Sequence, residues 1–413
     1  MNIVFLIWNY WPCIEGGSER QARQISMELV KRGHTCTVWT AWINANLPKK
    51  EIKDGCTILR FGRWVPWQGR LRQVLERFHH FFCRILSKYF SITERQYSYF
   101  QKHFDFWILL PVVYVTRRSF MKEVRGELDR TVSPPNIIHL HEPSWLGGFA
   151  VLLAAGKNVP VLCQEATNPV LPVVGYDVPF RKRIERVRKD AHFIAMAPYL
   201  AADLYAKGVL KERVHLLPNG VKMPLRRPLQ RNSSLVLYVG NFSQGTHWKA
   251  FDVLFDAWKI IHDRNLGLRL VVLGGGNRTA WEKYVDGLGC AGSIDFMGRV
   301  NNLEEYYAEA SVFVLPSRVE GMSNALLEAQ SWGIPCVVSD IPANTSVVDN
   351  GINGFVVPVN DYEKLALAII KLHQEPTLRK VMGSFAYKRM KDKYSLGGVT
   401  DRLVDIYNKV CEY

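Results

Sequence analysis

The stretch "VFVLPSRVEGMSNALLEAQSWGIPCVVSD", residues 312–340, predicts the fold of its part of the chain. Two short apolar runs, Val312–Leu315 and Cys336–Val338, lie on either side of a longer segment, Ser323–Trp332. Short apolar runs are typical of strands buried on both faces, and the longer segment is typical of a helix. The stretch therefore predicts a strand, a loop, a helix and a parallel strand.

The same alternation runs along most of the 413 residues, in two sets. A proline-rich basic segment, "KMPLRRPLQRNSS", separates the sets and indicates a linker. We therefore predict an α/β protein with two Rossmann-like doubly wound domains facing a central cleft. The predicted boundaries are residues 1–222, residues 223–390, and a C-terminal helix, 391–413, that returns to the first domain. The predicted strands are Ile3–Trp8, Cys36–Trp39, Ile137–His141, Val159–Cys163, Phe193–Met196, Val214–Leu217, Leu235–Val239, Leu268–Leu273, Ile294–Phe296, Val312–Leu315 and Cys336–Val338.

Composition indicates an ordered globular protein, with 48% hydrophobic and 22% charged residues. The 8 cysteines form no C-x-x-C pair, so we expect free thiols and no zinc site. The apolar run at residues 106–115 is interrupted by Pro111 and is too short to span a bilayer. The apolar start lacks a basic flank, so we expect a buried strand and no signal peptide.

Four loops are expected at the carboxyl edge of the second sheet, where ligands of such sheets bind. Glycine after a strand is most often turn geometry, but four such loops on one edge indicate a binding site. Lys249 follows the first of these loops. The loops contribute Gly240 and Asn241, Gly274, Arg299, and the segment Glu320–Asn324.

The fourth loop has the chemistry of a site for a nucleotide sugar. The backbone of Gly321, Met322, Ser323 and Asn324 opens a helix and can approach a diphosphate, to which Lys249 would add a positive charge. A carboxylate repels phosphate but accepts hydrogen bonds from a diol, so Glu328 suits a ribose and Glu320 suits sugar hydroxyls. The alternative is structural, with Glu320 as a helix-start acid and Glu328 as an exposed helix residue.

These residues form an E-x7-E pair, followed by "DNGINGFVVP", and the stretch resembles the retaining GT-B glycosyltransferases of family 4. "EGGSERQARQISMELVKRGHTCTVWT", "IIHLHEP", "LLPNGV" and "YVGNFSQGTHWKAFDVL" extend the resemblance over most of the chain. It implies a nucleotide-sugar donor, with Glu328 on the ribose, Glu320 on the sugar, and Lys249 with the 321–324 backbone on the diphosphate.

The resemblance also implies roles for other loops, and the sequence departs from the family at two points. Gly16 and Gly17 would close on the phosphate or acceptor side, and Arg299 would lie near the base. Asn241 stands where the family often has arginine, which leaves more of the phosphate charge to Lys249. Gln164 and Glu165 stand where the family often has histidine; Glu165 is a candidate base or electrostatic stabiliser, or merely a loop residue.

No D-x-D pair occurs, so we expect neither a metal nor any other cofactor. Retention would let the leaving phosphate deprotonate the acceptor. His141, in "HLHEP", is either a polar contact at the cleft or a packed strand-end residue.

A basic, aromatic insertion spans about residues 60–125, with 13 Lys and Arg against 4 Asp and Glu from Arg60 to Arg125. Within it, Arg70–Phe90 has a basic stripe beside an apolar stripe at helical spacing. This pattern fits an interfacial helix on anionic lipid, or a core-packed helix with a solvated basic side. Nucleic acid is disfavoured because no binding module is present.

We therefore predict a metal-independent retaining hexosyltransferase that uses a UDP- or GDP-type sugar. Its acceptor would be a lipid-linked or membrane-presented glycan in bacterial polysaccharide or lipopolysaccharide synthesis. We expect it at the cytoplasmic face of the inner membrane, as a peripheral protein. The alternatives are a nucleotide-sugar 2-epimerase of GT-B fold and a non-catalytic, membrane-docked partner subunit. The sugar, the base, the acceptor and the oligomeric state stay open at this point.

Overall fold

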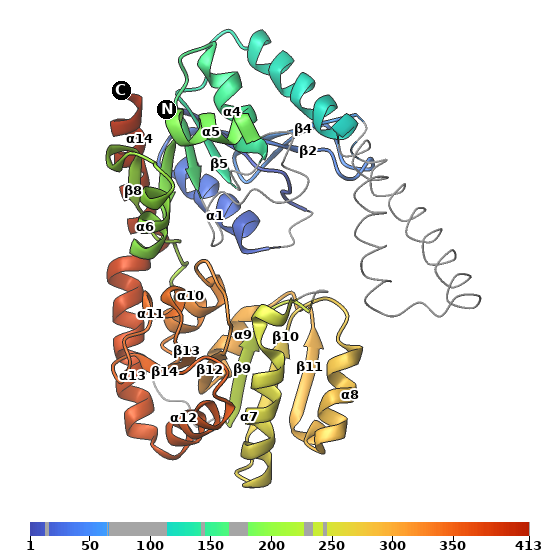
Figure 1. Cartoon of the computed structure of the whole chain (residues 1–413), viewed down its shortest axis with the longest axis vertical. Coiled ribbons are helices and arrows are strands. Elements are labelled where there is room, and N and C mark those ends of the chain that lie inside the picture. Colours follow the sequence, from blue (N-terminus) through green and yellow to red (C-terminus); the bar gives the residue numbers. More distant parts are fainter. Residues whose placement is uncertain are drawn as a thin grey trace, which may run out of the picture. The chain divides into compact units, whose positions relative to one another are not determined.

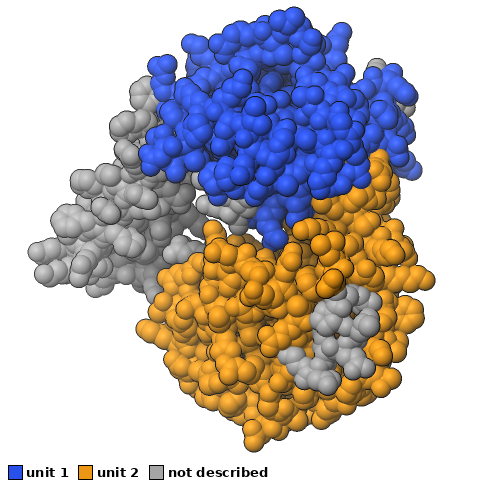
Figure 2. Space-filling model, turned by 180° about the vertical axis from the view of Figure 1, so that it is seen from behind, with its two compact units in different colours: residues 1–194, 203–215, 404–413 blue, residues 195–202, 216–403 orange. Residues whose placement is uncertain are grey.

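The computed structural model describes residues 1–12, 16–63, 65, 114–141, 145–164, 181–226, 234–242 and 246–412. Two of the predicted features, the stripes of Arg70–Phe90 and the candidate Glu165, lie outside these residues. The described chain divides into two compact units, coloured separately in Figure 2. Unit 1 comprises residues 1–194, 203–215 and 404–413, and unit 2 comprises residues 195–202 and 216–403.

Unit 1 is built on an eight-stranded sheet in the order β3-β4-β2-β1-β5-β6-β7-β8. The pairings from β4 to β7 are parallel, and β3 pairs antiparallel with β4. The strands are β1 (Asn2–Leu6), β2 (Thr35–Ala41), β3 (Lys50–Lys53), β4 (Cys56–Phe61), β5 (Ile137–His141), β6 (Val161–Gln164), β7 (His192–Ala195) and β8 (Val214–Leu216). The helices are α1 (Gly17–Lys31), a helix over residues 114–130, α4 (Trp145–Ala155), α5 (Arg181–Asp190), α6 (Pro198–Ala206, shared with unit 2) and the end of α14 (Leu396–Cys411).

Unit 2 is built on a six-stranded sheet in the order β11-β10-β9-β12-β13-β14, with parallel pairing throughout. In Figure 1, α7 runs in about the same direction as the strands of this sheet. The strands are β9 (Leu235–Val239), β10 (Arg269–Leu273), β11 (Ile294–Gly298), β12 (Val312–Leu315), β13 (Cys336–Ser339) and β14 (Gly354–Val357). The helices are α7 (Phe251–Asp263), α8 (Thr279–Leu288), α9 (Leu303–Glu309), α10 (Asn324–Ser331), α11 (Pro342–Thr345), α12 (Tyr362–Gln374), α13 (Pro376–Arg389) and most of α14.

Apolar periodicity explains how these elements bury their faces. The middle of β1 is fully buried, as expected of a central strand covered on both faces. α7 instead buries one stripe, including Leu254, Trp258 and Ile261, while Asp263 is exposed near its end. The predicted doubly wound α/β fold is confirmed in each unit.

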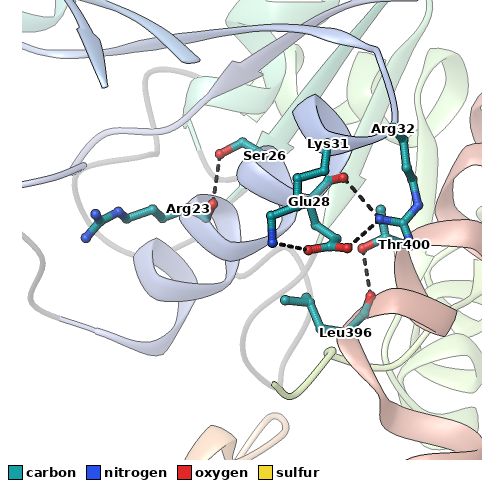
Figure 3. A network of polar contacts seen from close by, with 7 residues as sticks. All are labelled: Arg23, Ser26, Glu28, Lys31, Arg32, Leu396 and Thr400. Atoms are coloured by element: carbon teal, nitrogen blue, oxygen red, sulfur yellow. Dashed lines mark hydrogen bonds and ion pairs between the residues drawn. The ribbon is translucent and has the colours of Figure 1, made fainter. Parts of the chain in front are cut away.

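Helix α1 begins without a side-chain cap. Its first residue is Gly17 and its N-cap residue is Gly16. Farther along α1, Glu28 accepts hydrogen bonds from Arg32 at 2.7 Å and from Lys31 at 3.1 Å (Figure 3). Burial tends to raise the pKa of the Glu28 carboxyl, but these two cations hold it below its ordinary value. Pairs at this spacing stabilise the helix surface.

The segment expected to leave the first domain is bound into unit 2. The amide of Val221 donates to the carbonyl of Tyr394 at 2.8 Å, and the amide of Leu396 donates back to Val221 at 2.8 Å. Gly220 packs beside Leu396, where a Cβ would lie 3.0 Å from the leucine side chain. Unit 2 therefore already includes residues 216–222, ahead of the predicted boundary at residue 222.

Candidate functional site

The sheet of unit 2 reverses its strand order between β9 and β12. From β9 the chain proceeds outward through β10 and β11, and from β12 it proceeds the other way through β13 and β14. The loops that follow β9 and β12 therefore diverge, and in open α/β sheets ligands bind beside such a point. These two loops carry Lys249 and Glu320, respectively.

The loops after β9 and β10 pack backbone against backbone. The amide of Gly240 donates to Leu273, and the amide of Gly275 donates to Oδ1 of Asn241 at 2.9 Å. Gly274 has a φ of 155°, and a Cβ there would lie 2.0 Å from the carbonyl oxygen of Gly240. Glycine is thus required at position 274 by this close approach. Asn241, which stands where the family often has arginine, binds the neighbouring loop.

The third loop joins the same edge. The amide of Gly274 donates to the carbonyl of Gly298 at 2.8 Å, which ties the end of β11 to the end of β10. Arg299 follows and is exposed, and a Cβ at Gly275 would lie 3.4 Å from its Nε. The absence of a side chain at Gly275 therefore leaves room for the guanidinium group beside this loop.

Glu320 and Lys249 form an ion pair. Nζ of Lys249 lies 2.7 Å from Oε1 of Glu320, and the hydroxyl of Ser317 donates to the same oxygen at 2.8 Å. The Glu320 side chain is 11% exposed and that of Lys249 is 22% exposed. The two residues are 71 positions apart in sequence, so only the fold brings them together. The structure thus joins the predicted sugar-side and phosphate-side groups.

The backbone after Glu320 is held from two sides within unit 2. The hydroxyl of Tyr199, from α6, donates to the carbonyl oxygens of Gly321 and Glu320. The amide of Asn219 donates to Sδ of Met322 at 3.3 Å. These contacts fix the approach to α10, where the predicted diphosphate-binding backbone lies.

Helix α10 begins as the sequence predicts. Ser323 is its N-cap, and its hydroxyl accepts from the amide of Leu326. Asn324 accepts from Nδ2 of Asn219 at 3.0 Å through its Oδ1. Farther along, the buried Tyr307 donates to Oε2 of Glu328 at 2.9 Å. Glu328 is half-buried and anchored, in contrast to the alternative of an exposed helix residue.

The charge of Glu320 affects the pKa of two tyrosines. Burial, and then the nearby carboxylate, raise the pKa of Tyr199 to about 12. The same two causes raise the pKa of the fully buried Tyr238, which lies beneath Gly240 on β9. Both phenols therefore stay protonated, and Tyr199 remains a hydrogen-bond donor to the loop.

Sequence reasoning missed the residues that support these groups. Ser317, Tyr199, Tyr307 and Asn219 contact the candidate residues or their backbone, but none forms a motif with them. Ser317 alone had a local signal, three positions before Glu320. The others come from distant elements, and only the assembled sheet brings them to the site.

The candidates of unit 1 lie at the corresponding edge of its own sheet. A Cβ at Gly16 would lie 2.8 Å from Oε2 of the buried Glu19, so glycine leaves space for that carboxylate at the start of α1. His141 is a packed strand-end residue: it is fully buried, and its ring stacks on His139 at 4.8 Å. Burial lowers the pKa of His141 to about 3, so it is neutral near pH 7. Gln164, at the end of β6, is buried as well.

Two protein-family models match consecutive parts of the chain. The model described as "Glycosyl transferase 4-like domain" matches residues 16–220, and that described as "Glycosyl transferases group 1" matches residues 233–375. The two matches span most of the sequence. The chain belongs to the GT-B glycosyltransferases.

Relatives of this glycosyltransferase match part or all of it. UDP-Gal:alpha-D-GlcNAc-diphosphoundecaprenol alpha-1,3-galactosyltransferase of Escherichia coli is 28% identical over 214 residues, which cover 47% of this chain and 54% of the relative. The chain thus spans about half the length of that relative. An uncharacterized glycosyltransferase, MJ1607, of Methanocaldococcus jannaschii is 28% identical over 442 residues, covering 100% of this chain and 99% of the relative.

The glycosyltransferase fold extends over the whole chain. Sucrose-phosphate synthase from Thermosynechococcus elongatus superimposes with a TM-score of 0.75 at 20% identity, covering 99% of this chain and 98% of that one. At this identity the likeness shows the fold. Within the described part of the glycosyltransferase, no helix is long and apolar enough to cross a membrane.

Proposed function

We propose that this glycosyltransferase transfers a sugar from a nucleotide-sugar donor to an acceptor hydroxyl with retention of configuration. The observation that carries the proposal is the Lys249–Glu320 pair at the point where the unit 2 sheet reverses its order. A cation suited to a diphosphate and a carboxylate suited to a sugar stand side by side there. The E-x7-E pattern of Glu320 and Glu328 supports the same assignment.

The donor would be bound in parts. Glu328, oriented by Tyr307, would accept hydrogen bonds from the ribose. The amides at the start of α10 and the ammonium of Lys249 would bind the diphosphate, because helix N-termini and lysine both favour phosphate oxygens. Gly240 and Gly274 let the backbones of the loops after β9 and β10 pack against each other. Arg299 would lie near the base.

Glu320 would act on the sugar. As the bond from the anomeric carbon to the diphosphate oxygen breaks, positive charge develops on the sugar ring, and a nearby carboxylate stabilises it. The acceptor oxygen forms the new bond on the same face, and its proton passes to the departing phosphate oxygen. In this scheme the protein supplies no nucleophile and no metal is needed. Glu165, the candidate base or electrostatic stabiliser, would act in this scheme as an electrostatic stabiliser, because the proton passes to the phosphate.

We propose a lipid-linked or membrane-presented glycan as the acceptor. The E. coli relative is named for a diphosphoundecaprenol-linked acceptor. In this chain the helix over residues 114–130 exposes Arg118, Lys122 and Arg125 at helical spacing, and it starts with the exposed Tyr114 and Val115. A basic stripe beside exposed apolar side chains suits an anionic membrane surface. The enzyme would then act as a peripheral protein on the cytoplasmic face of the membrane, with the Gly16–Gly17 loop on the acceptor side.

The first test is a thermal-shift panel of UDP, GDP, ADP and dTDP. A nucleotide that binds only the folded state raises the apparent melting temperature. The matching nucleotide sugars are then incubated with lipid-linked glycan acceptors, and the anomeric configuration of the product is determined by NMR. Transfer with retention is the expected result. Formation of a 2-epimer without acceptor, or tight nucleotide binding with neither transfer nor donor hydrolysis, would contradict the proposal.

A further inference from the structure

Arg318 connects the loop of Glu320 to the segment of Lys249. Its guanidinium donates to both carboxylate oxygens of Asp252, at 3.0 and 2.6 Å, and to the carbonyl of His247 at 2.6 Å. Its backbone amide donates to the carbonyl of Trp248 at 2.7 Å. One residue of the Glu320 loop therefore binds the chain both before and after Lys249.

The segment that Arg318 holds contains an unfavourable backbone conformation. Ala250, directly after Lys249, is fully buried and left-handed, with φ 54° and ψ 46°. This region is unfavourable for a residue with a Cβ, and such a conformation persists where its surroundings impose it. The contacts of Arg318 lie on either side of Ala250, at His247 and Trp248 before it and at Asp252 after it.

The charge of Asp252 is stabilised by the same contact. Burial acts to raise the pKa of the Asp252 carboxyl, but the hydrogen bonds and charge of Arg318 bring it below its ordinary value. Nε of Arg318 also donates to Oδ1 of Asn360 at 2.6 Å, and this hydrogen bond orients the plane of the guanidinium group. The ammonium group of a lysine is not planar and has fewer donors, so a lysine at this position cannot make all of these hydrogen bonds at once.

We propose that Arg318 is a positioning residue of the donor site, which holds Lys249 at the place where the donor diphosphate binds. The inference rests on the proposed function and deepens it. Arg318 acts through the backbone at residues 247–252 and needs no contact with the donor. Its loss would let the Lys249 segment relax away from the left-handed turn, and the ammonium group would leave its position beside Glu320.

The test compares Arg318→Gln with a matched control, Arg389→Gln. Arg389 also pairs with an aspartate, Asp349, and donates to a backbone carbonyl, that of Ser346, elsewhere in unit 2. The two aspartates have the same side-chain exposure, 43%. We expect Arg318→Gln to weaken UDP binding about 10-fold and to lower kcat at least 10-fold, whereas Arg389→Gln changes both by less than 2-fold. Arg318→Lys should not restore either value. Equal effects of the two glutamine variants would overturn the proposal.

A double-mutant cycle with Lys249 separates positioning from general damage. If Arg318 acts through Lys249, Arg318→Gln adds nothing to the loss of UDP affinity in a Lys249→Ala background, because coupled residues are not additive. Full additivity would refute the positioning role. If Lys249→Ala alone leaves the UDP Kd unchanged, the assignment of the diphosphate site is wrong, and the proposed function fails with it.

Discussion

Replacing Glu320 by glutamine should change binding and turnover in opposite directions. The amide keeps the shape of the side chain, and its oxygen can still accept from Ser317 and Lys249, but the negative charge is lost. Lys249 is paired with Glu320 at 2.7 Å, so under the proposed function an incoming diphosphate competes with a carboxylate for the same ammonium group. The glutamine variant removes that competitor and its repulsion of the phosphates.

The magnitude follows from Coulomb's law. Two unit charges about 4 Å apart interact by about 4 kcal/mol at an effective dielectric constant of 20. Both side chains are partly exposed, at 11% and 22%, and the glutamine oxygen retains a hydrogen bond, so only part of this is released. We take about 1.4 kcal/mol, which is about 10-fold in affinity. In the transition state the lost carboxylate no longer stabilises the sugar cation, so kcat should fall about 10²-fold or more.

Titration calorimetry with UDP, or with the nucleotide that gives the largest thermal shift, measures the affinity, and radiolabelled sugar transfer measures kcat. Glu282→Gln is the control, because it removes the same charge from a 2.7 Å ion pair on α8. The sequence analysis places Glu320 on the sugar and Lys249 on the diphosphate, and it predicts no contact between the two side chains. An unchanged or weaker UDP Kd would refute the competition argument, and a near-normal kcat would refute the catalytic assignment.

Glu328→Ala should raise the Kd of donor and free nucleotide together by about 10-fold or more, since hydrogen bonds to a charged acceptor contribute about 1.5–3 kcal/mol, with kcat less affected. Transfer should persist in excess EDTA, and full loss restored by Mg²⁺ or Mn²⁺ would contradict the phosphate assignment. Burial and His215 lower the pKa of His192 to about 4, so the unfolded state binds a proton at this residue before the folded state does. The free energy of unfolding should therefore fall by about 2 kcal/mol between pH 7.5 and pH 5 because of this residue. His192→Gln should make the free energy of unfolding, measured by chemical denaturation, less dependent on pH in this range. Asn241→Arg should tighten UDP binding a few-fold, as a second cation beside Lys249, while Asn241→Ala should not.

The order of strands and helices could be predicted from apolar runs and helical periodicity. The ranges of β5, β9 and β12 agree with the prediction residue for residue. Three strands of the structure, β3, β4 and β14, are absent from the prediction. The start of α1 has a glycine N-cap, which leaves no side-chain signal, and β3 is a polar edge strand with the burial pattern of an exposed segment.

Candidate site residues could be proposed from their residue types, but the residues that contact them could not. Glycine loops, a lysine and two glutamates on one sheet edge have a chemical pattern that the sequence shows directly. The Lys249–Glu320 pair, the Tyr307–Glu328 hydrogen bond and the contacts of Arg318 depend on distances across the sheet. Such contacts are set by packing, and no local pattern encodes them.

The cation of the candidate site is paired with a carboxylate of the same site, which bears on how the proposed reaction would begin. The charge of Lys249 is balanced by Glu320, and the amide oxygen of Asn241 is bonded to Gly275, so neither side chain is held ready for phosphate alone. Under the proposed function a diphosphate would take over the ammonium group, and the charge of the Glu320 carboxylate would become available to the sugar attached to that diphosphate. Donor binding and the activation of Glu320 would then be a single exchange of partners. A carboxylate that is unpaired only in the presence of donor stabilises a developing sugar cation more strongly than one that stays paired with lysine.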